Sequence, residues 1–288
     1  MSGKQSFIGS LMPPMALRWL DRVVLRRTIR LTGHYASWAD AVAASDGYDD
    51  PRILDRVAAA ARAVRDGHAA YDQDGVTFTE SSPDWPLTTI LLAAAVKSGG
   101  KLSVLDFGGS LGNTRRRAKP LLEGLPETRW AVVEQPSLVD IGRREFQDEQ
   151  LAFFDSPTEA VAKSACNVLL LGSVLQYLPT PWQTLHDLLG LAPWQAVVVH
   201  RTPAWNWPER LAVQETPKCI YGVPVCYPSW VFNAGDLHAA LSPFGRLISL
   251  PAEEQPVALG GSFGDYASIA VLRDPRVAPV FPAEGPAT

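Results

Sequence analysis

The run VLDFGGSLG, residues 104–112, has the composition of a ligand-binding turn. An apolar segment ends in Asp106, and Gly108, Gly109 and Gly112 follow it. Glycine permits positive φ angles and lets a ligand approach the backbone closely. A glycine-rich turn after the first strand of an open α/β sheet lies where such sheets bind their ligands. By itself the run could serve NAD, another nucleotide or S-adenosylmethionine, or it could be a turn needed only for packing.

The acid and the glycine spacing distinguish between these ligands. The glycines are spaced G-G-x-x-G rather than G-x-G-x-x-G, and the sequence has no G-x-x-x-x-G-K-[ST] phosphate loop. A carboxylate just before the glycines would repel a pyrophosphate, whereas the sulfonium and ammonium groups of S-adenosylmethionine are cations. We therefore expect Asp106 and the three glycines to bind S-adenosylmethionine as the cofactor.

A second acid follows at the distance expected for an adenosine site. Glu134 ends the next apolar run, 22 residues after Gly112, and Gln135 comes directly after it. A carboxylate there can accept hydrogen bonds from both ribose hydroxyls, in NAD as well as in S-adenosylmethionine. Asp155 ends the third run and could accept from the adenine amino group, or it could cap the next helix with Ser156. Glu134 could also be a solvated strand end.

Further polar residues follow the fourth apolar run. Ser173 comes directly after it, and Tyr177 lies in the short turn beyond. We expect Ser173 beside the cofactor and Tyr177 where a methyl acceptor binds. The alternative is that the turn serves only to bury Leu175 and Leu178.

The fifth apolar run ends in His200 and Arg201, two residues that suit an acceptor site. A sulfonium is an activated donor, so alignment of the acceptor supplies most of the catalysis, and a general base adds roughly 10²–10⁴-fold. His200 is the leading candidate base because imidazole titrates near neutrality; otherwise it is a packed histidine. Arg201 could bind an acidic group of the acceptor or pair with Glu209 or Glu215.

Aromatic and proline residues are concentrated in the segment 202–231, which we interpret as a long insert without regular structure. Long inserts in compact domains are usually functional, and aromatic rings can stack on sugar faces or on an apolar acceptor. The alternative is that the rings seal the N-terminal part onto the sheet. The candidate substrate-binding residues are Trp205, Tyr221 and Tyr227 of the insert and Tyr35 and Trp38 of the N-terminal part.

The elements that carry these residues alternate regularly from residue 101 onward. The apolar runs are nearly continuous, which is typical of parallel strands covered on both faces. The predicted strands are 102–105, 130–133, 151–154, 168–171, 196–199, 246–250 and 266–272. The predicted helices are 113–124, 137–147, 157–163, 181–190 and 234–241. This alternation predicts an α/β fold of the Rossmann-like type.

The first hundred residues have a different character. Residues 4–30 hold six basic side chains and one acid, a local net charge of +5, with apolar residues at helical spacing. We expect a basic amphipathic helix over 1–33, which lies either on an anionic membrane surface or on its own domain. We expect a helical cap over 34–100, with a polar loop around Asp72, then the catalytic domain over 101–273 and a loose tail over 274–288.

Composition narrows the class of protein further. The 288 residues include 26 basic and 30 acidic side chains, a net charge of −4, which argues against nucleic-acid binding by bulk charge. Three scattered cysteines give no disulfide framework, and no metal-ligand cluster is visible, so we expect a cytoplasmic protein without a metal. No apolar run is long enough to span a membrane, and the N-terminus lacks the features of a signal peptide. The oligomeric state is left open.

The motifs in order resemble a known family. The runs DFGGSLG, VVEQP, SVLQYLP and RTP, with YPSW downstream and YASW and GYD upstream, resemble a family of methyltransferases found among bacterial polysaccharide-biosynthesis genes. The resemblance covers residues 33–272. It implies a class I S-adenosylmethionine-dependent fold, a seven-stranded sheet with a reversed last strand, and cofactor contacts by Asp106, Gly108, Gly109, Gly112 and Glu134. His200 stands where the family has an acid.

These observations together predict O-methylation of a sugar or glycan intermediate in surface-polysaccharide assembly. The basic N-terminal helix would suit a lipid-linked acceptor at the inner membrane face. Three alternatives stay open: methylation of a small secondary metabolite, an NAD-dependent reductase, and a cofactor-binding partner protein without catalytic activity.

Overall fold

The computed structural model describes residues 29–45, 51–216, 224–251, 257–259, 262–264 and 266–274. Nearly all of the predicted basic helix, the predicted tail and Tyr221 lie outside these residues. The end of the basic segment is a strand, so the helix predicted to reach residue 33 is wrong there. In β1 (Ile29–Thr32), Ile29 and Leu31 are buried while Arg30 and Thr32 are exposed, the period of two of a strand with one covered face.

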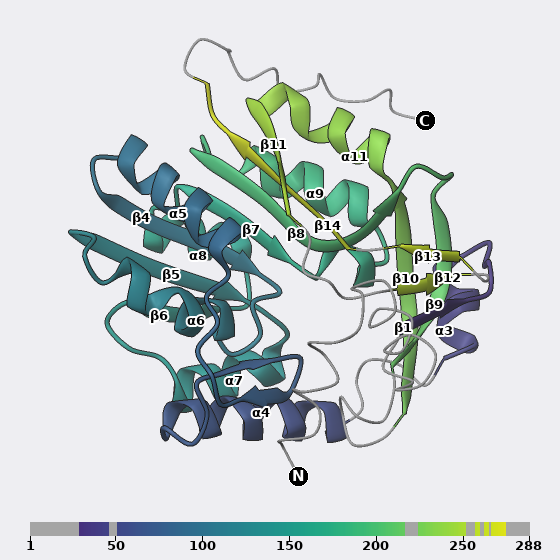
Figure 1. Cartoon of the computed structure of the whole chain (residues 1–288), viewed down its shortest axis with the longest axis horizontal. Helices are drawn as coiled ribbons and strands as arrows, with labels where there is room; N and C mark the ends of the chain where they lie inside the picture. Colours follow the sequence, from purple (N-terminus) through teal and green to yellow (C-terminus); the bar gives the residue numbers. More distant parts are fainter. Residues whose placement is uncertain are drawn as a thin grey trace, which may run out of the picture.

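Seven strands form the α/β sheet that the sequence predicts (Figure 1). Their spatial order is β6–β5–β4–β7–β8–β14–β11. Strands β4 to β8 are parallel, and β14 runs antiparallel to both β8 and β11. The bounds are β4 (Lys101–Phe107), β5 (Glu127–Val133), β6 (Leu151–Phe154), β7 (Val168–Gly172), β8 (Ala196–Trp205), β11 (Arg246–Leu250) and β14 (Tyr266–Leu272). This is a Rossmann-like α/β sheet in which the last strand along the chain, β14, is reversed.

Helices cover both faces of this sheet and bury its apolar runs (Figure 1). One face carries α5 (Trp85–Lys97), α6 (Asn113–Leu122) and α7 (Pro136–Glu145). The other carries α8 (Pro157–Ser164), α9 (Pro181–Gly190) and α11 (Ala234–Leu241). Coverage on both faces explains why the strands are apolar throughout. The helices predicted between the strands are confirmed to within a few residues.

The insert is not without regular structure; it forms strands that extend the sheet. Beyond β8, strands β9 (Arg210–Thr216) and β10 (Val225–Asn233) pair antiparallel. β1 pairs with β9 on its outer side, and β12 (Val257–Leu259) and β13 (Ser262–Gly264) follow, which gives this sheet twelve strands among the described residues. β10 joins the end of β8 through Phe232, opposite Ala204, and Asn233, opposite Trp205. Most residues of β9 and β10 are buried, and this burial stabilises the strands despite Pro228.

The segment predicted as a helical cap contains a β-hairpin as well as helices. Helices α3 (Trp38–Ala43) and α4 (Pro51–Arg65) precede β2 (Tyr71–Gln73) and β3 (Val76–Phe78), and the expected loop is the turn of this hairpin. Asp74 and Gly75 have φ angles of 51° and 74°. Positive φ at both turn residues is the geometry that an Asp-Gly pair favours, because it matches the twist of the paired strands.

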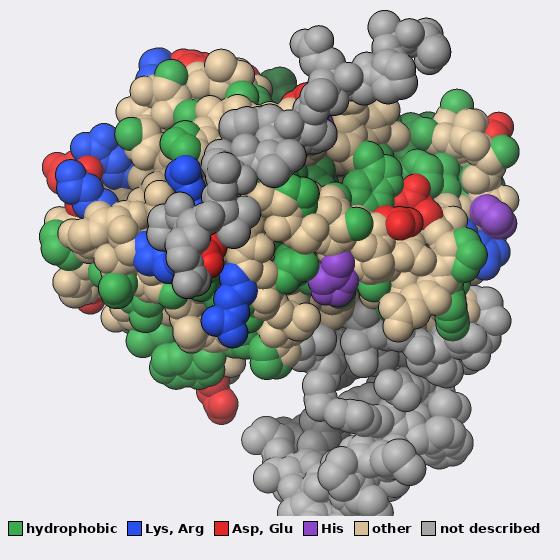
Figure 2. Space-filling view, turned by 90° about the horizontal axis from the view of Figure 1, so that it is seen from above, with side chains coloured by type: hydrophobic (Ala, Val, Ile, Leu, Met, Phe, Trp, Pro, Cys, Tyr) green, Lys and Arg blue, Asp and Glu red, His purple; other side chains and the backbone are tan. Residues whose placement is uncertain are grey.

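No helix among the described residues is both long and apolar enough to cross a bilayer. On the face shown in Figure 2, basic and acidic side chains are scattered among neutral ones rather than separated by sign. The candidate site residues lie instead around a cavity at the carboxyl ends of the parallel strands.

Candidate functional site

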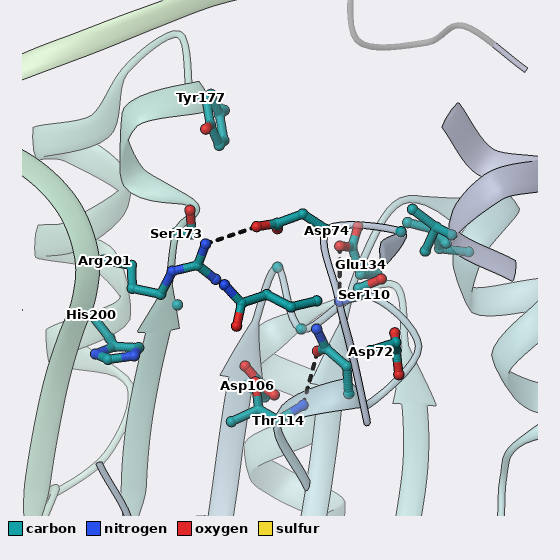
Figure 3. Close-up of a pocket in the computed structure, with 18 of the residues that line it drawn as sticks. Asp72, Asp74, Asp106, Ser110, Thr114, Glu134, Ser173, Tyr177, His200 and Arg201 are labelled. Atoms are coloured by element: carbon teal, nitrogen blue, oxygen red, sulfur yellow. Dashed lines mark hydrogen bonds and ion pairs between the residues drawn. The ribbon is translucent and has the colours of Figure 1, made fainter. Parts of the chain in front are cut away.

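A cavity of about 410 Å³ lies where β4, β5, β7 and β8 end (Figure 3). It brings together ten of the sequence-predicted residues: Asp106, Gly108, Gly109, Glu134, Gln135, Ser173, Tyr177, His200, Arg201 and Tyr227. The carboxyl edge is where doubly wound sheets bind ligands, since the loops there diverge.

The other predicted residues have different positions. Gly112 ends the glycine turn at the start of α6, with φ of 81°. Asp155 pairs with Arg143 at 2.9 Å. Tyr35 and Trp38 pack against Ala41, Leu211 and Val213, and Trp205 packs edge-on against Trp207 with ring centroids 5.3 Å apart. These three aromatic side chains do not line the cavity; they pack strands and helices together.

The glycine turn is folded tightly over Asp106. Gly108 has φ of 72°, and a β-carbon at this position would lie 2.4 Å from Val174 Cγ2. A β-carbon at Gly109 would lie 2.5 Å from Asp106 Cγ. Glycine is therefore required at both positions. Gly108 needs it for the backbone angle and for space, and Gly109 needs it for space alone. The turn exposes backbone to the cavity directly above a buried acid.

Asp106 is 1% exposed, and Trp130 Nε1 donates a hydrogen bond of 2.8 Å to its Oδ2. Burial raises the pKa of Asp106 to about 7; the Trp130 hydrogen bond opposes this shift, and the neighbouring Glu134 adds to it. A carboxyl group with such a pKa gains from a cation placed beside it, because the cation replaces the solvation that burial removed. The cavity floor therefore favours a positively charged ligand.

Glu134 faces the same part of the cavity and is held by backbone amides. Its Oε1 accepts from the amide of Ser110 at 3.1 Å, and its Oε2 accepts from the amide of Gln135 at 2.8 Å. Burial raises the pKa of Glu134 although both amide hydrogen bonds lower it. Each carboxylate oxygen keeps a further lone pair, so this fixed group can accept from a pair of ligand hydroxyls.

His200 is 6% exposed and both of its ring nitrogens have protein partners. Its Nε2 lies 2.9 Å from Asp84 Oδ2, and its Nδ1 lies 2.9 Å from Ser268 Oγ. Asp84 also caps α5 by accepting from the amide of Leu87 at 3.0 Å. Burial raises the pKa of Asp84, but the His200 and Leu87 contacts outweigh it, and the pKa is lowered. The role of His200 as a base stays a prediction.

Arg201 pairs with a residue that the sequence analysis did not select. Its Nη2 lies 2.7 Å from Asp74 Oδ2, and the two side chains meet across the cavity (Figure 3). The partners expected from the sequence are engaged elsewhere: Glu209 accepts from Trp182, and Glu215 accepts from Thr32. The signal for Asp74 was the Asp-Gly pair between Tyr71–Gln73 and Val76–Phe78, a strong hairpin pattern.

A polar wall faces the cavity from β9 and β10. Tyr177 donates to Gln214 Oε1 at 3.2 Å, and Gln214 Nε2 donates to the hydroxyl of Tyr227 at 3.0 Å. Thr216 Oγ1 also lies 3.0 Å from that hydroxyl. The rings of Tyr177 and Tyr227 meet edge-on, with centroids 5.2 Å apart. Gln214 and Thr216, which the sequence analysis did not select, complete a wall of uncharged hydrogen-bonding groups.

Strained backbone is concentrated at this cavity. Among the described residues other than glycine, five have positive φ angles, and four of them line the cavity: Asp74, Ser110, Ser173 and Arg201. Such conformations persist only where surrounding contacts enforce them, and they cluster at functional sites. In the described part of the chain, no three His, Cys, Asp or Glu side chains are grouped to hold a metal ion.

Comparisons with known proteins give structural matches only. No family model matches this chain, and no curated protein matches it. The N-terminal domain of EvdMO1, crystallised in the presence of S-adenosylhomocysteine and D-fucose, has 14% identity and a TM-score of 0.42, with coverage of 78% of this chain and 100% of that chain. CalS10, an amino pentose methyltransferase from Micromonospora echinaspora involved in calicheamicin biosynthesis, has 13% identity, a TM-score of 0.42 and coverage of 66% and 91%. An S-adenosylmethionine-dependent methyltransferase from Clostridium acetobutylicum has 10% identity, a TM-score of 0.43 and coverage of 67% and 92%.

Proposed function

We propose that this chain is an S-adenosylmethionine-dependent methyltransferase that methylates an oxygen of a sugar or glycan intermediate in surface-polysaccharide assembly. The observation that carries the proposal is the buried acid Asp106, which lies under a turn where two glycines leave no space for a β-carbon. A turn of this kind admits a ligand close to the backbone, and the acid selects a cation over a pyrophosphate.

The residues of the cavity fit this cofactor. Asp106 would face its cationic part, Glu134 would accept from the ribose hydroxyls, and Gly108 and Gly109 would give the space for close backbone approach. The lining holds the acids Asp72, Asp74, Asp84, Asp106 and Glu134 against the cations Arg117 and Arg201. Asp72, Asp74 and Asp84 pair with Arg116, Arg201 and His200. Asp106 and Glu134 accept only from uncharged donors in the described chain, which supports a positively charged donor. When bound, the cofactor would supply an activated methyl group on a sulfonium.

The acceptor would lie against the polar wall. Tyr177, Gln214 and Tyr227 offer uncharged donors and acceptors, while Ile29 and Ile53 add apolar surface nearby. This combination suits a ring that carries several hydroxyls on an apolar frame. Methylation of one hydroxyl forms a carbon–oxygen bond, breaks the carbon–sulfur bond and releases the hydroxyl proton. Two side chains of the lining are candidate acceptors for that proton, His200 and Asp74.

Cofactor binding is the first test. Isothermal titration calorimetry of the full chain with S-adenosylmethionine, S-adenosylhomocysteine and NADH should give binding to the first two only. The Asp106→Asn and Glu134→Gln variants should weaken that binding while melting as folded proteins. Binding of NADH without S-adenosylmethionine would overturn the proposal and favour a reductase.

The acceptor is the second test. Release of S-adenosylhomocysteine should be measured with nucleotide-linked sugars, with lipid-linked glycan extracts and with hydroxylated secondary metabolites. Turnover on a glycan acceptor supports the proposal. Turnover on metabolites alone would retain the methyltransferase and overturn the role in polysaccharide assembly.

A further inference from the structure

A β-bulge interrupts β8 at the edge of the cavity. Val199 lies opposite Ile269 and Thr202 lies opposite Ala267, so two residues of β8 stand against one residue of β14. The two residues of β8 are His200 and Arg201, and the single residue of β14 is Ser268. An extra residue in one strand bends that strand and redirects a side chain, and such bulges are common beside active sites.

Arg201 has an unfavourable backbone conformation in this bulge. Its φ is 52°, in the left-handed region that favours glycine. Its amide donates to Ser268 Oγ at 3.1 Å instead of to a strand carbonyl, and its carbonyl accepts from Gln176 Nε2 at 3.3 Å. Gln176 is fully buried and Ser268 is 4% exposed. Two buried side chains therefore hold the backbone of Arg201 in this conformation.

The hydrogen bonds continue from Ser268 to the start of α5. With His200 neutral and its proton on Nε2, the ring donates to Asp84 and accepts from the hydroxyl of Ser268. The Ser268 oxygen in turn accepts from the amide of Arg201. In this arrangement each donor has one acceptor. The series of hydrogen bonds runs from Asp84, which caps α5, to the strained backbone of Arg201.

The result of this backbone geometry is the direction of the Arg201 side chain. Its guanidinium reaches Asp74 at the tip of the β2–β3 hairpin, at 2.7 Å, and so joins the end of β8 to the hairpin across the cavity (Figure 3). The side chain of Arg201 is 13% exposed, and Ser268 is absent from the cavity lining. Ser268 can therefore influence the cavity only through His200 and Arg201, to which it is hydrogen-bonded.

We propose that Asp84, His200 and Ser268 form a positioning chain that fixes the bulge, so that Arg201 holds the β2–β3 hairpin closed over the cavity. On this account His200 is a positioning residue. The inference depends on the contacts of the ligand-free chain and not on the reaction that the cavity carries out.

Hydrogen–deuterium exchange of the hairpin in the ligand-free full chain tests the inference. Arg201→Ala removes the contact with Asp74. The loss of a hydrogen bond between charged groups should speed exchange of residues 71–78 by about tenfold. Ser268→Ala should give a comparable increase. His200→Asn should retain most of the protection, because the Asn oxygen can still accept from Ser268. Ser103→Ala is the matched control: Ser103 is also buried, and its hydroxyl donates to the carbonyl of Ser164 at 2.7 Å, far from the bulge along the chain.

Two results would overturn the inference that the chain positions Arg201. If Arg201→Ala speeds exchange and Ser268→Ala does not, the chain does not position Arg201. If neither variant does, the hairpin is not held by Arg201, and the inference is overturned as well. Thermal melting separates these results from global unfolding, since Ser103→Ala should lower the melting temperature about as much as Ser268→Ala without affecting the hairpin.

A kinetic measurement adds a second readout, which does rest on the proposed function. A positioning role predicts that Ser268→Ala and His200→Ala lower kcat by similar factors and leave the shape of the pH–rate profile unchanged. A role of His200 as a base predicts that His200→Ala alone removes the acidic limb of the profile, which would overturn the inference. Failure of the methyltransferase proposal leaves the exchange experiment intact.

Discussion

The indole of Trp130 donates a 2.8 Å hydrogen bond to Asp106, which lies one strand away at the floor of the cavity. Both side chains are 1% exposed. The indole supplies one fixed dipole but no charge, so the carboxyl group stays without a cation among its protein contacts in the described chain. This relationship determines how the free protein and its complex should respond to pH.

Stability should fall as the pH rises toward neutrality. Asp106 has a pKa of about 7 in the folded chain against an ordinary 3.8, so between these values the folded state holds a proton that the unfolded state has lost. This proton stabilises the folded chain by on the order of 4 kcal/mol. The stabilisation is complete below the unfolded pKa and is lost above the folded pKa. Urea unfolding from pH 4 to pH 8 should show this decline in the native chain and a weaker one in Asp106→Asn. Equal slopes would contradict the assignment.

Cofactor affinity should change with pH in the opposite direction. A cationic ligand favours the ionised form of Asp106, so binding below pH 7 must expel the proton first. Affinity for S-adenosylmethionine should therefore rise by up to about tenfold per pH unit and level off above pH 7. Titration calorimetry in buffers of different ionisation enthalpy would detect the released proton. Asp106→Asn should bind weakly at every pH and lack this release, and a native slope in that variant would refute the role of Asp106.

Adding a methyl group to the glycine turn should remove binding. Gly109→Ala places a β-carbon against Asp106, a buried group without room to move, and overpacking of this kind costs about 1–3 kcal/mol. Gly142→Ala is a matched control, because its β-carbon would lie 2.4 Å from the Phe153 ring, outside the cavity lining. Both variants should melt at lower temperature, but only Gly109→Ala should lose cofactor affinity. Equal affinities in the two folded variants would argue against a cofactor at this turn.

The polar wall should affect the acceptor and not the donor. Gln214→Leu removes one hydrogen bond from each of the Tyr177 and Tyr227 hydroxyls, which lie in a buried network. The loss of two hydrogen bonds that fix the wall costs about 1–3 kcal/mol, so KM for the acceptor should rise roughly 5- to 150-fold. Calorimetry should show unchanged affinity for S-adenosylmethionine. Thr216→Val removes a 3.4 Å contact with Gln214 and a 3.0 Å contact with the Tyr227 hydroxyl but keeps the Tyr177–Gln214 hydrogen bond, so it should have a smaller effect.

The central sheet and the donor side of the cavity could be predicted from sequence because local patterns determine them. Strands covered on both faces are apolar throughout, and the glycine turn directly follows one of them. Asp106 and Glu134 each end a predicted strand, so the carboxyl edge of a parallel sheet brings them together. The expected cofactor residues of β4 and β5 therefore line one cavity.

The acceptor side could not be predicted in the same way. Pro228 lies inside β10, opposite Val213, and prolines within a run argue against a strand, so the sequence did not indicate β10. β1 was assigned to a helix because Arg30 fits a basic stripe equally well. The contact between Asp74 and Arg201 joins residues 127 positions apart, and the buried chain through Ser268 depends on a bulge. Such pairings follow from tertiary structure and leave no periodic pattern.

The junction between β8 and β10 sets the strands of the polar wall apart from the central sheet. Two register pairs, at Phe232 and Asn233, join β10 to β8, whereas β8 pairs with β7 at five positions and with β14 at six. We therefore expect substitutions in β9 and β10 to alter the polar wall while the pairing of the central strands is kept.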